Sequence, residues 1–243
     1  MTTQQKLLHV GTSGWQYRHW AGVFYPDDIP KKRWFEHYAA TFDTVEINNT
    51  FYNLPKGETF DDWRRRAPEG FGFTLKFSRY GTHLKRLKDP SGTIGMFLDR
   101  AERLGEALGP ILVQLPPNFN PDAERLAAFL DEAPRRHRWA VEFRNPDWLC
   151  ERIYAVLRDH NAALVVHDLI DDHPHVATAD WVYLRFHGAG DGGDYTPQAL
   201  TASARRIKDH LSANRHVYAY FNNDAEGYAV ANARDLRRYV LGD

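Results

Sequence analysis

The chain has 243 residues, of which 43% are hydrophobic and 26% are charged, a composition that fits one large globular α/β domain. Its 31 basic and 32 acidic side chains give a formal net charge of −1, which excludes the overall positive field of a typical duplex-DNA binder. A single cysteine, Cys150, excludes an intramolecular disulfide.

The sequence shows no membrane-directed segment. No stretch approaches the run of about 18 apolar residues that a membrane span needs. The first six residues are polar, and no apolar core of a signal peptide follows them. We therefore expect a cytoplasmic protein with no membrane partner.

Segments rich in β-branched and aromatic residues alternate with segments whose apolar residues recur every three or four positions. The first pattern predicts strands at Leu7–Thr12, Thr44–Asn48, Phe73–Phe77, Ile111–Leu115, Trp139–Phe143, Ala163–His167, Val182–Phe186 and Val217–Phe221. The second predicts helices that include Trp34–Phe42, Ile94–Leu108, Ala123–Leu130, Ile153–His160, Ala199–Leu211 and Ala229–Leu241. Only the connection between the sixth and seventh strands, Asp171–Asp180, is too short for a full helix.

This alternation of strand and helix predicts a parallel sheet in the α/β class. Eight such units predict closure into a single (β/α)₈ TIM-barrel-like domain over residues 1–243. No internal repeat or linker divides the chain. An open, doubly wound sheet is the alternative architecture.

Strand alternation predicts which side chains face the barrel interior, because successive residues of a strand point to opposite sides. In the seventh strand the apolar residues Val182, Leu184 and Phe186 face the helices. This arrangement leaves Tyr183, Arg185 and His187 inward. The same reasoning directs inward Glu46, Asn48, Thr74, Lys76, Ser78, Gln114, Glu142 and Arg144. The sixth and eighth strands are too uniformly apolar for this argument, but Asp168, Asn222 and Asn223 fall at their carboxyl ends.

A barrel interior built only for packing is dominated by branched apolar residues, and this one is predicted to be charged at its carboxyl end. One buried ion pair would be weak support for a site, because such pairs also occur as structural contacts. Charges from several strands at the same end favour a binding site. We predict catalytic roles for Glu46, Glu142, His187 and Asp168, and substrate-binding roles for Asn48, Lys76, Gln114, Arg144, Arg185, Asn222, Asn223, Trp15 and Tyr52.

Blocks spread in order over almost the whole chain resemble the YecE-like family, also called domain of unknown function 72. They are GTSGW (11–15), WAGVFYP (20–26), EINNTFY (46–52), KFSRYGTH (76–83), QLPPNF (114–119), EFR (142–144), YLRFHG (183–188) and YFNN (220–223). The resemblance implies a TIM-barrel-like fold and no established reaction. This chain is compact for the family, with only a short glycine-rich segment, Ala189–Asp194, after the seventh strand.

The predicted mouth favours an enzyme that acts on a phosphorylated or other small anionic substrate by carboxylate acid–base chemistry. Arg144, Arg185 and Lys76 would recognise the anion, and the glycine-rich segment that follows His187 would add backbone amides. Two carboxylates beside cations can have well-separated pKa values and thus serve as acid and base. This hypothesis needs no metal and no other cofactor.

Two alternatives remain open. A metal-dependent hydrolase or isomerase would use Glu46, Glu142, Asp168 and either His167 or His187 as ligands. The pair His173 and His175 also has ligand spacing, but we predict that it is solvent-exposed in a loop away from the strand ends.

A non-catalytic module for nucleotides or single-stranded nucleic acid is the second alternative, and it would use loop aromatics together with nearby basic residues. These residues are Trp15, Tyr17, Trp20, Tyr52, Tyr80, Arg79, Lys85, Arg86 and Lys88. Trp15 and Trp20 would also have a purely structural role if their rings pack into the barrel mouth and close it. The sequence gives no indication of the oligomeric state.

Overall fold

Eight parallel strands form one sheet in the order β1-β8-β7-β6-β5-β4-β3-β2 in the computed structural model, which describes residues 3–188, 190 and 193–242. The strands are β1 Leu8–Thr12, β2 Thr44–Ile47, β3 Gly72–Lys76, β4 Leu108–Gln114, β5 Trp139–Glu142, β6 Ala163–His167, β7 Trp181–Phe186 and β8 His216–Phe221. Each matches a strand predicted from the sequence.

The two edge strands, β1 and β2, meet through a parallel bridge between Ser13 and Glu46. This contact nearly closes the sheet into a barrel, which confirms the (β/α)₈ fold and sets the open doubly wound sheet aside. The Tyr38 hydroxyl adds a second link, because it accepts from the Thr12 amide at 2.9 Å and donates to the Thr44 carbonyl at 3.0 Å.

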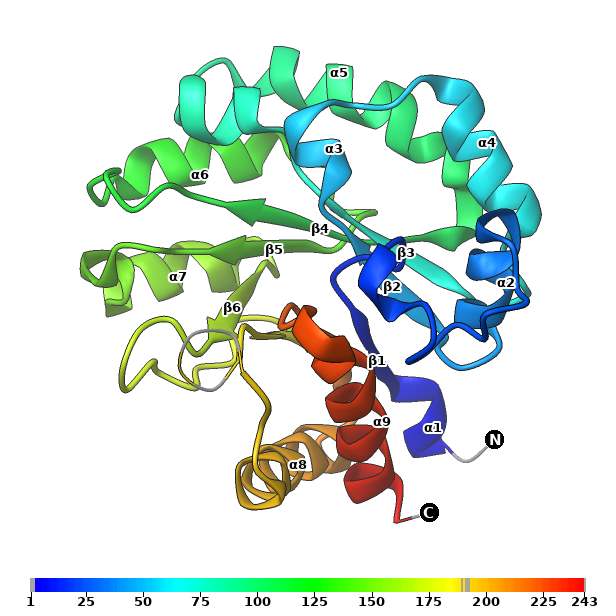
Figure 1. Cartoon of the computed structure of the whole chain (residues 1–243). Coiled ribbons are helices and arrows are strands. Elements are labelled where there is room, and N and C mark those ends of the chain that lie inside the picture. Colours follow the sequence, from blue (N-terminus) through cyan, green and yellow to red (C-terminus); the bar gives the residue numbers. More distant parts are fainter. Residues whose placement is uncertain (1–2, 189, 191–192, 243) are drawn as a thin grey trace.

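Helices surround the strands, and the two described ends of the chain lie near each other beside α1 and α9 (Figure 1). The helices are α1 Thr3–Leu7, α2 Trp34–Ala39, α3 Asn49–Tyr52, α4 Gly57–Arg66, α5 Pro90–Ala101, α6 Ala123–Glu132, α7 Glu151–Asp159, α8 Pro197–Ser212 and α9 Tyr228–Leu241. The helix predicted at Ile94–Leu108 is instead α5 followed by a 3₁₀ segment, Glu102–Ala107, in which Gly105 has a φ of 57°. Because a positive φ is foreign to a helix, Gly105 kinks the helical path shortly before β4 begins at Leu108.

Strand alternation separates two cores, as the sequence predicts. Outward residues such as Phe73, Val141 and Val217 join the helices in the larger core. The barrel interior holds a smaller cluster of Leu112, Ala140, Ala163, Val165, Trp181, Tyr183, Tyr218 and Tyr220. In β6, whose facing the sequence left open, Ala163 and Val165 therefore point inward, and His167 follows them.

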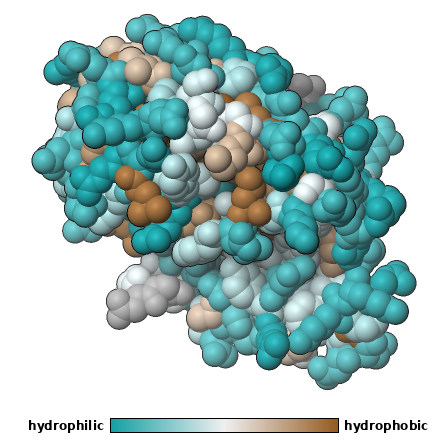
Figure 2. Space-filling model, turned by 90° about the horizontal axis from the view of Figure 1, so that it is seen from above, coloured by the Kyte–Doolittle hydropathy of each residue, from teal (hydrophilic) through white to brown (hydrophobic). Residues whose placement is uncertain are grey.

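The connection from β6 to β7 contains no helix, as predicted. Within the described chain, no helix combines the length and the apolar character needed to cross a bilayer. On the face seen in Figure 2, hydrophobic side chains lie in separate patches among hydrophilic ones.

Candidate functional site at the carboxyl mouth

Glu46 lies above the aromatic interior, fully buried at the carboxyl end of β2. Its Oε1 accepts from the Ser13 hydroxyl at 2.7 Å and from Arg185 Nη2 at 2.6 Å. Its Oε2 accepts from the Tyr183 hydroxyl at 2.6 Å and from Arg185 Nε at 3.0 Å. Two donors on each oxygen satisfy the carboxylate, so Glu46 fixes the Arg185 guanidinium in a bidentate pair.

Glu142 is equally buried at the end of β5 and binds the other side of the same guanidinium. Its Oε2 accepts from Arg185 Nη1 at 2.7 Å, and its Oε1 accepts from Arg144 Nε. Burial opposes ionisation of this carboxyl, but the charges of Arg185 and Arg144 outweigh it and lower its pKa. Arg185 therefore bridges carboxylates from β2 and β5 across the barrel, and the pKa of Arg185 is raised by these two partners despite burial.

Lys76 lies at the end of β3 in the same charged layer and is only 8% exposed. Its Nζ lies 4.4 Å from the centre of the Phe51 ring. No hydrogen bond or ion pair of Nζ is found among the described residues. Burial, together with the charge of Arg185, lowers its pKa from 10.5 to about 8. Three cations thus face two carboxylates, and the excess positive charge belongs to Lys76.

Two buried polar atoms near this layer have no hydrogen-bond partner in the described chain, Asn48 Oδ1 and His187 Nε2. His187 Nδ1 lies 3.2 Å from the Asn222 side-chain nitrogen, which can only donate, so Nδ1 is the acceptor. Burial and the neighbouring Arg185 lower the pKa of His187 to about 3, which keeps the ring neutral. The proton of the neutral ring then lies on Nε2, so His187 offers an unused N–H donor.

A row of histidines extends from His187 along the end of β6. The rings of His167 and His187 are 6.1 Å apart, and the rings of His167 and His173 are 4.7 Å apart. His173 is only 7% exposed and packs beside a strand end. The prediction that His173 is a solvated loop residue away from the strand ends was wrong, because the short β6–β7 connection folds back onto β6. His175 is exposed, as predicted.

The remaining predicted site residues lie in different places. Gln114 is half-buried and pairs in register with Glu142, and it makes no side-chain hydrogen bond with a described residue. Asp168 accepts from the His187 amide at 2.9 Å and from the Tyr195 hydroxyl, and so ties the end of β6 to the segment after β7. Tyr52 is 75% exposed beside the mouth.

Asn223 and Trp15 do not reach this charged layer. Asn223 is buried and donates to the Gly193 carbonyl at 3.1 Å and to Asn232 Oδ1 at 2.9 Å. Trp15 is buried outside the barrel, where its ring packs against Phe35, Trp63 and Phe73. The chain turns at Gly14, whose φ is 101°, and this turn directs Trp15 toward the helices. We therefore leave both residues out of the proposed site.

The sequence missed two groups that hold the charged layer together, Ser13 and Tyr183. Strand alternation predicts the inward direction of Tyr183, but not its hydrogen bond to Glu46 on a distant strand. The predicted anion-binding loop includes Ala189, Asp191 and Gly192, which lie outside the described residues. Among the residues that are described, no group of three or more histidine, cysteine, aspartate or glutamate side chains is arranged to hold a metal ion.

Comparison with known proteins gives consistent results. Residues 9–242 match the family model described as "Protein of unknown function DUF72". The UPF0759 protein YecE of Escherichia coli K12 is 30% identical over 146 residues, which are 60% of this chain and 51% of that relative, so the matched part spans about half of YecE. The UPF0759 protein YunF of Bacillus subtilis is 23% identical over 95% of this chain and 93% of its own length.

A solved structure of a DUF72 family protein from Thermotoga maritima is similar throughout, with a TM-score of 0.85 and 28% identity. The likeness covers 98% of this chain and all of that one. A DUF72 family protein from Enterococcus faecalis has the same fold, with a TM-score of 0.80 at 20% identity over 96% of this chain and 95% of its own. The family resemblance read from the sequence motifs is thereby confirmed.

Proposed function

The chain belongs to the DUF72 family, and we propose that it is an enzyme that acts on a small phosphorylated or otherwise anionic substrate at the carboxyl mouth of its barrel. Active sites of (β/α)₈ enzymes lie at this face, because the strand ends and the loops after them converge there.

The observation that carries the proposal is the buried, unpaired Lys76. Partial removal of an ammonium group from water, without a carboxylate that pairs with it, reduces the stability of the fold. An anionic ligand would supply the missing partner. His187 Nε2–H is a second donor without a partner at the mouth, and the terminal nitrogens of Arg144 make no hydrogen bond with a described residue. These three groups would bind the anion.

For acid–base chemistry the geometry favours Glu142 over Glu46. Each oxygen of Glu46 accepts two hydrogen bonds, whereas each oxygen of Glu142 accepts one. Glu142 therefore keeps lone pairs for a substrate proton, and we assign it the role of general base. Arg185 and Arg144 lower its pKa, so it becomes an effective base only once the substrate anion neutralises the charge of Arg144. Lys76, whose pKa of about 8 is close to neutrality, is the proposed proton donor. Glu46 acts as a positioning residue, because it orients Arg185.

Anion binding is tested with inorganic sulfate, which keeps its charge over the working pH range, by isothermal titration calorimetry. We expect Lys76→Met to weaken sulfate binding by about tenfold or more, because a hydrogen bond to a charged group is lost. Lys88→Met is the matched control, because it removes an exposed lysine from the segment that follows β3. This variant should bind sulfate as the native chain does. Absence of sulfate binding by the native chain, or equal binding by both variants, would contradict the proposal.

Catalysis needs its own test, because binding alone fits a non-catalytic module as well. A panel of phosphorylated metabolites is incubated with the native chain, and products are followed by mass spectrometry and ³¹P NMR. Glu142→Gln should retain the substrate but lose turnover. If every bound compound is recovered unchanged from the native chain, the assignment as an enzyme fails.

A second candidate, a binding module for nucleotides or single-stranded nucleic acid, is favoured by two exposed aromatics that follow β2 and β3. Tyr52 is 75% exposed and Tyr80 is 45% exposed, and Lys85 Nζ lies 5.5 Å from the Tyr80 ring centre. Bases stack on such rings, and lysines contact the phosphates between them. Titration with a short oligonucleotide at two salt concentrations tests this candidate, because phosphate contacts make the affinity fall steeply with salt.

A further inference from the structure

The outer face of β6 and β7 lacks the helix that would cover it in a regular (β/α)₈ barrel, because residues 168–180 connect the two strands without one. The consequence is visible in the burial of the outward side chains. Val166 and Leu184 are only half-buried, whereas Val141 and Phe143 on the neighbouring β5 segment are completely buried. The vacant position leaves a groove between these two strands and α8.

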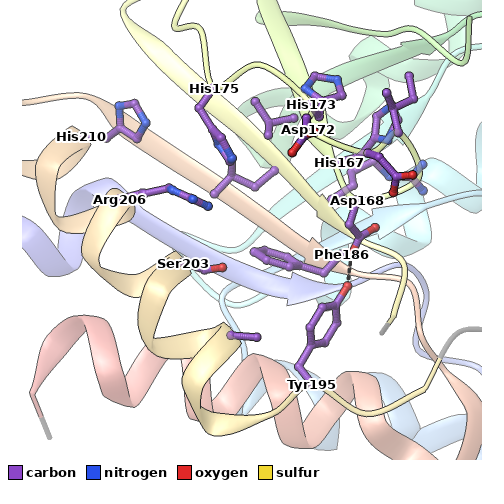
Figure 3. A pocket seen from close by; sticks show the side chains of 16 residues that line it. His167, Asp168, Asp172, His173, His175, Phe186, Tyr195, Ser203, Arg206 and His210 are labelled. Atoms are coloured by element: carbon purple, nitrogen blue, oxygen red, sulfur yellow. Dashed lines mark hydrogen bonds between the residues drawn. The ribbon is translucent and has the colours of Figure 1, made fainter. Parts of the chain in front are cut away.

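This groove has a cavity of about 350 Å³. Its apolar wall is formed by Val166, Leu184 and Phe186, and its opposite wall by α8 residues that include Ser203 and Arg206. The side chains of Ser203, Arg206 and His210 lie in this order along α8 and line the groove. His175, from the connection between β6 and β7, points toward Arg206 (Figure 3). A cavity of this size is in the range of pockets for small organic molecules.

The polar groups in the groove differ between its two ends, and burial lowers the pKa of both His175 and His210, so Arg206 carries the positive charge. Arg206, His175 and His210 lie at the end away from the barrel mouth, and none of the three makes a side-chain hydrogen bond or ion pair with a described residue. Asp168 lies at the end near the mouth, where it accepts from the Tyr195 hydroxyl, and Asp171 and Asp172 also line the groove. An unpaired arginine beside an apolar wall is complementary to a ligand that is apolar at one end and anionic at the other.

We propose that this groove binds a small organic anion, in which a carboxylate, sulfonate or phosphate group is joined to an aromatic or aliphatic body. The apolar body lies against Val166, Leu184 and Phe186. The anionic group pairs with the Arg206 guanidinium, which presents several donors to an acid group. The aspartates near the mouth disfavour the reverse orientation. This site lies on the outside of the barrel and does not depend on the anion proposed to bind at Lys76.

The test uses the fluorescent probe 8-anilinonaphthalene-1-sulfonate, which joins an aromatic body to a sulfonate. Fluorescence titration of the folded native chain should give saturable binding, and Arg206→Met should weaken it by about tenfold or more. Arg205→Met, which removes the neighbouring exposed arginine that does not line the groove, is the matched control and should bind the probe as the native chain does.

Ser203→Trp tests the location separately, because the larger ring would fill the groove without changing its charge. This variant should lose probe binding while its circular dichroism and its unfolding midpoint stay near those of the native chain. If Ser203→Trp disturbs the fold, the pair of arginine variants still decides the matter. Equal binding by Arg206→Met and Arg205→Met would overturn the proposal, and so would loss of the probe in Lys76→Met alone, which would place it at the mouth.

Discussion

Arg185 and Lys76 both carry charge into the barrel, but only the charge of Arg185 is compensated in the chain itself. Arg185 contacts a carboxylate on each side, and breaking such a buried pair costs about 3–5 kcal/mol. Lys76 has no such partner among the described residues, so its burial acts against the folded state. Residues that bind an anion are expected to show this conflict between stability and function.

The lowered pKa of Lys76 has a definite sign for stability. The folded chain releases this proton near pH 8, whereas the unfolded chain releases it near pH 10.5. Between these values the unfolded state binds more protons, so the contribution of Lys76 to the free energy of unfolding rises with pH. Below pH 8 Lys76 is charged in both states, and the burial of its charge lowers the free energy of unfolding by about 3 kcal/mol, the equivalent of this pKa shift.

Lys76→Met should therefore be more stable than the native chain at pH 7, and its advantage should shrink as the pH approaches 10.5. Urea unfolding at pH 7 and at pH 9.5 measures both free energies. In Lys88→Met the exposed lysine has no burial cost to lose, so its effect should be small and the same at the two pH values. A Lys76→Met chain that is less stable at pH 7, or an advantage that does not change with pH, would contradict this account.

At the level of elements, Thr178 holds the connection from β6 to β7 in place of a helix. Its buried hydroxyl donates to the Ala162 carbonyl at 2.7 Å and accepts from the Leu164 amide at 2.8 Å. One side chain thus satisfies two backbone groups at the start of β6. The groove beside α8 depends on this connection staying in place.

Thr178→Val keeps the shape of the side chain but removes both hydrogen bonds, and it should lower the free energy of unfolding by about 1–3 kcal/mol. Chemical denaturation measures the change. Thr201→Val is the matched control, because that hydroxyl donates to the Pro197 carbonyl on the exposed surface of α8, and the change should stay within about 0.5 kcal/mol. Similar losses in both variants would show that Thr178 has no special role.

The strands and their inward residues were predictable because both follow from a local pattern. Alternation places Glu46, Lys76, Glu142 and Arg185 on the interior face whatever the rest of the chain does. The order of strands then follows from the βα repeat, and the common carboxyl end follows from parallel pairing. The shared charged layer is therefore an outcome of periodicity.

The partners within that layer were not predictable. Arg185 pairs with both Glu46 and Glu142 and not with one of them alone. The reason is the curvature of the barrel, which brings the ends of β2 and β5 to opposite sides of the Arg185 guanidinium. Trp15 and His173 were misplaced for a related reason. Each follows a strand end, where the direction of the chain depends on a turn such as that at Gly14 and not on strand alternation.

At the scale of the whole molecule, the barrel closes where β1 and β2 approach most closely, and Gly11 makes this approach possible. A Cβ atom at Gly11 would lie 2.2 Å from the Thr44 carbonyl oxygen and 3.0 Å from the Tyr38 hydroxyl. The same closure brings the Ser13 hydroxyl to Glu46, so the shape of the barrel and the position of Arg185 are connected.

Gly11→Ala should lower the free energy of unfolding by about 3 kcal/mol, because the strands must separate to admit the methyl group. Gly95→Ala is the matched substitution, since Gly95 is exposed within α5 and its Cβ would have no heavy atom within 4 Å. Alanine favours a helix over glycine, so this change should raise the free energy of unfolding by up to about 1 kcal/mol. Chemical denaturation of the two variants should thus give opposite signs. If Gly11→Ala were neutral, closure would not depend on this contact, and sulfate binding at Lys76 should then also survive the substitution.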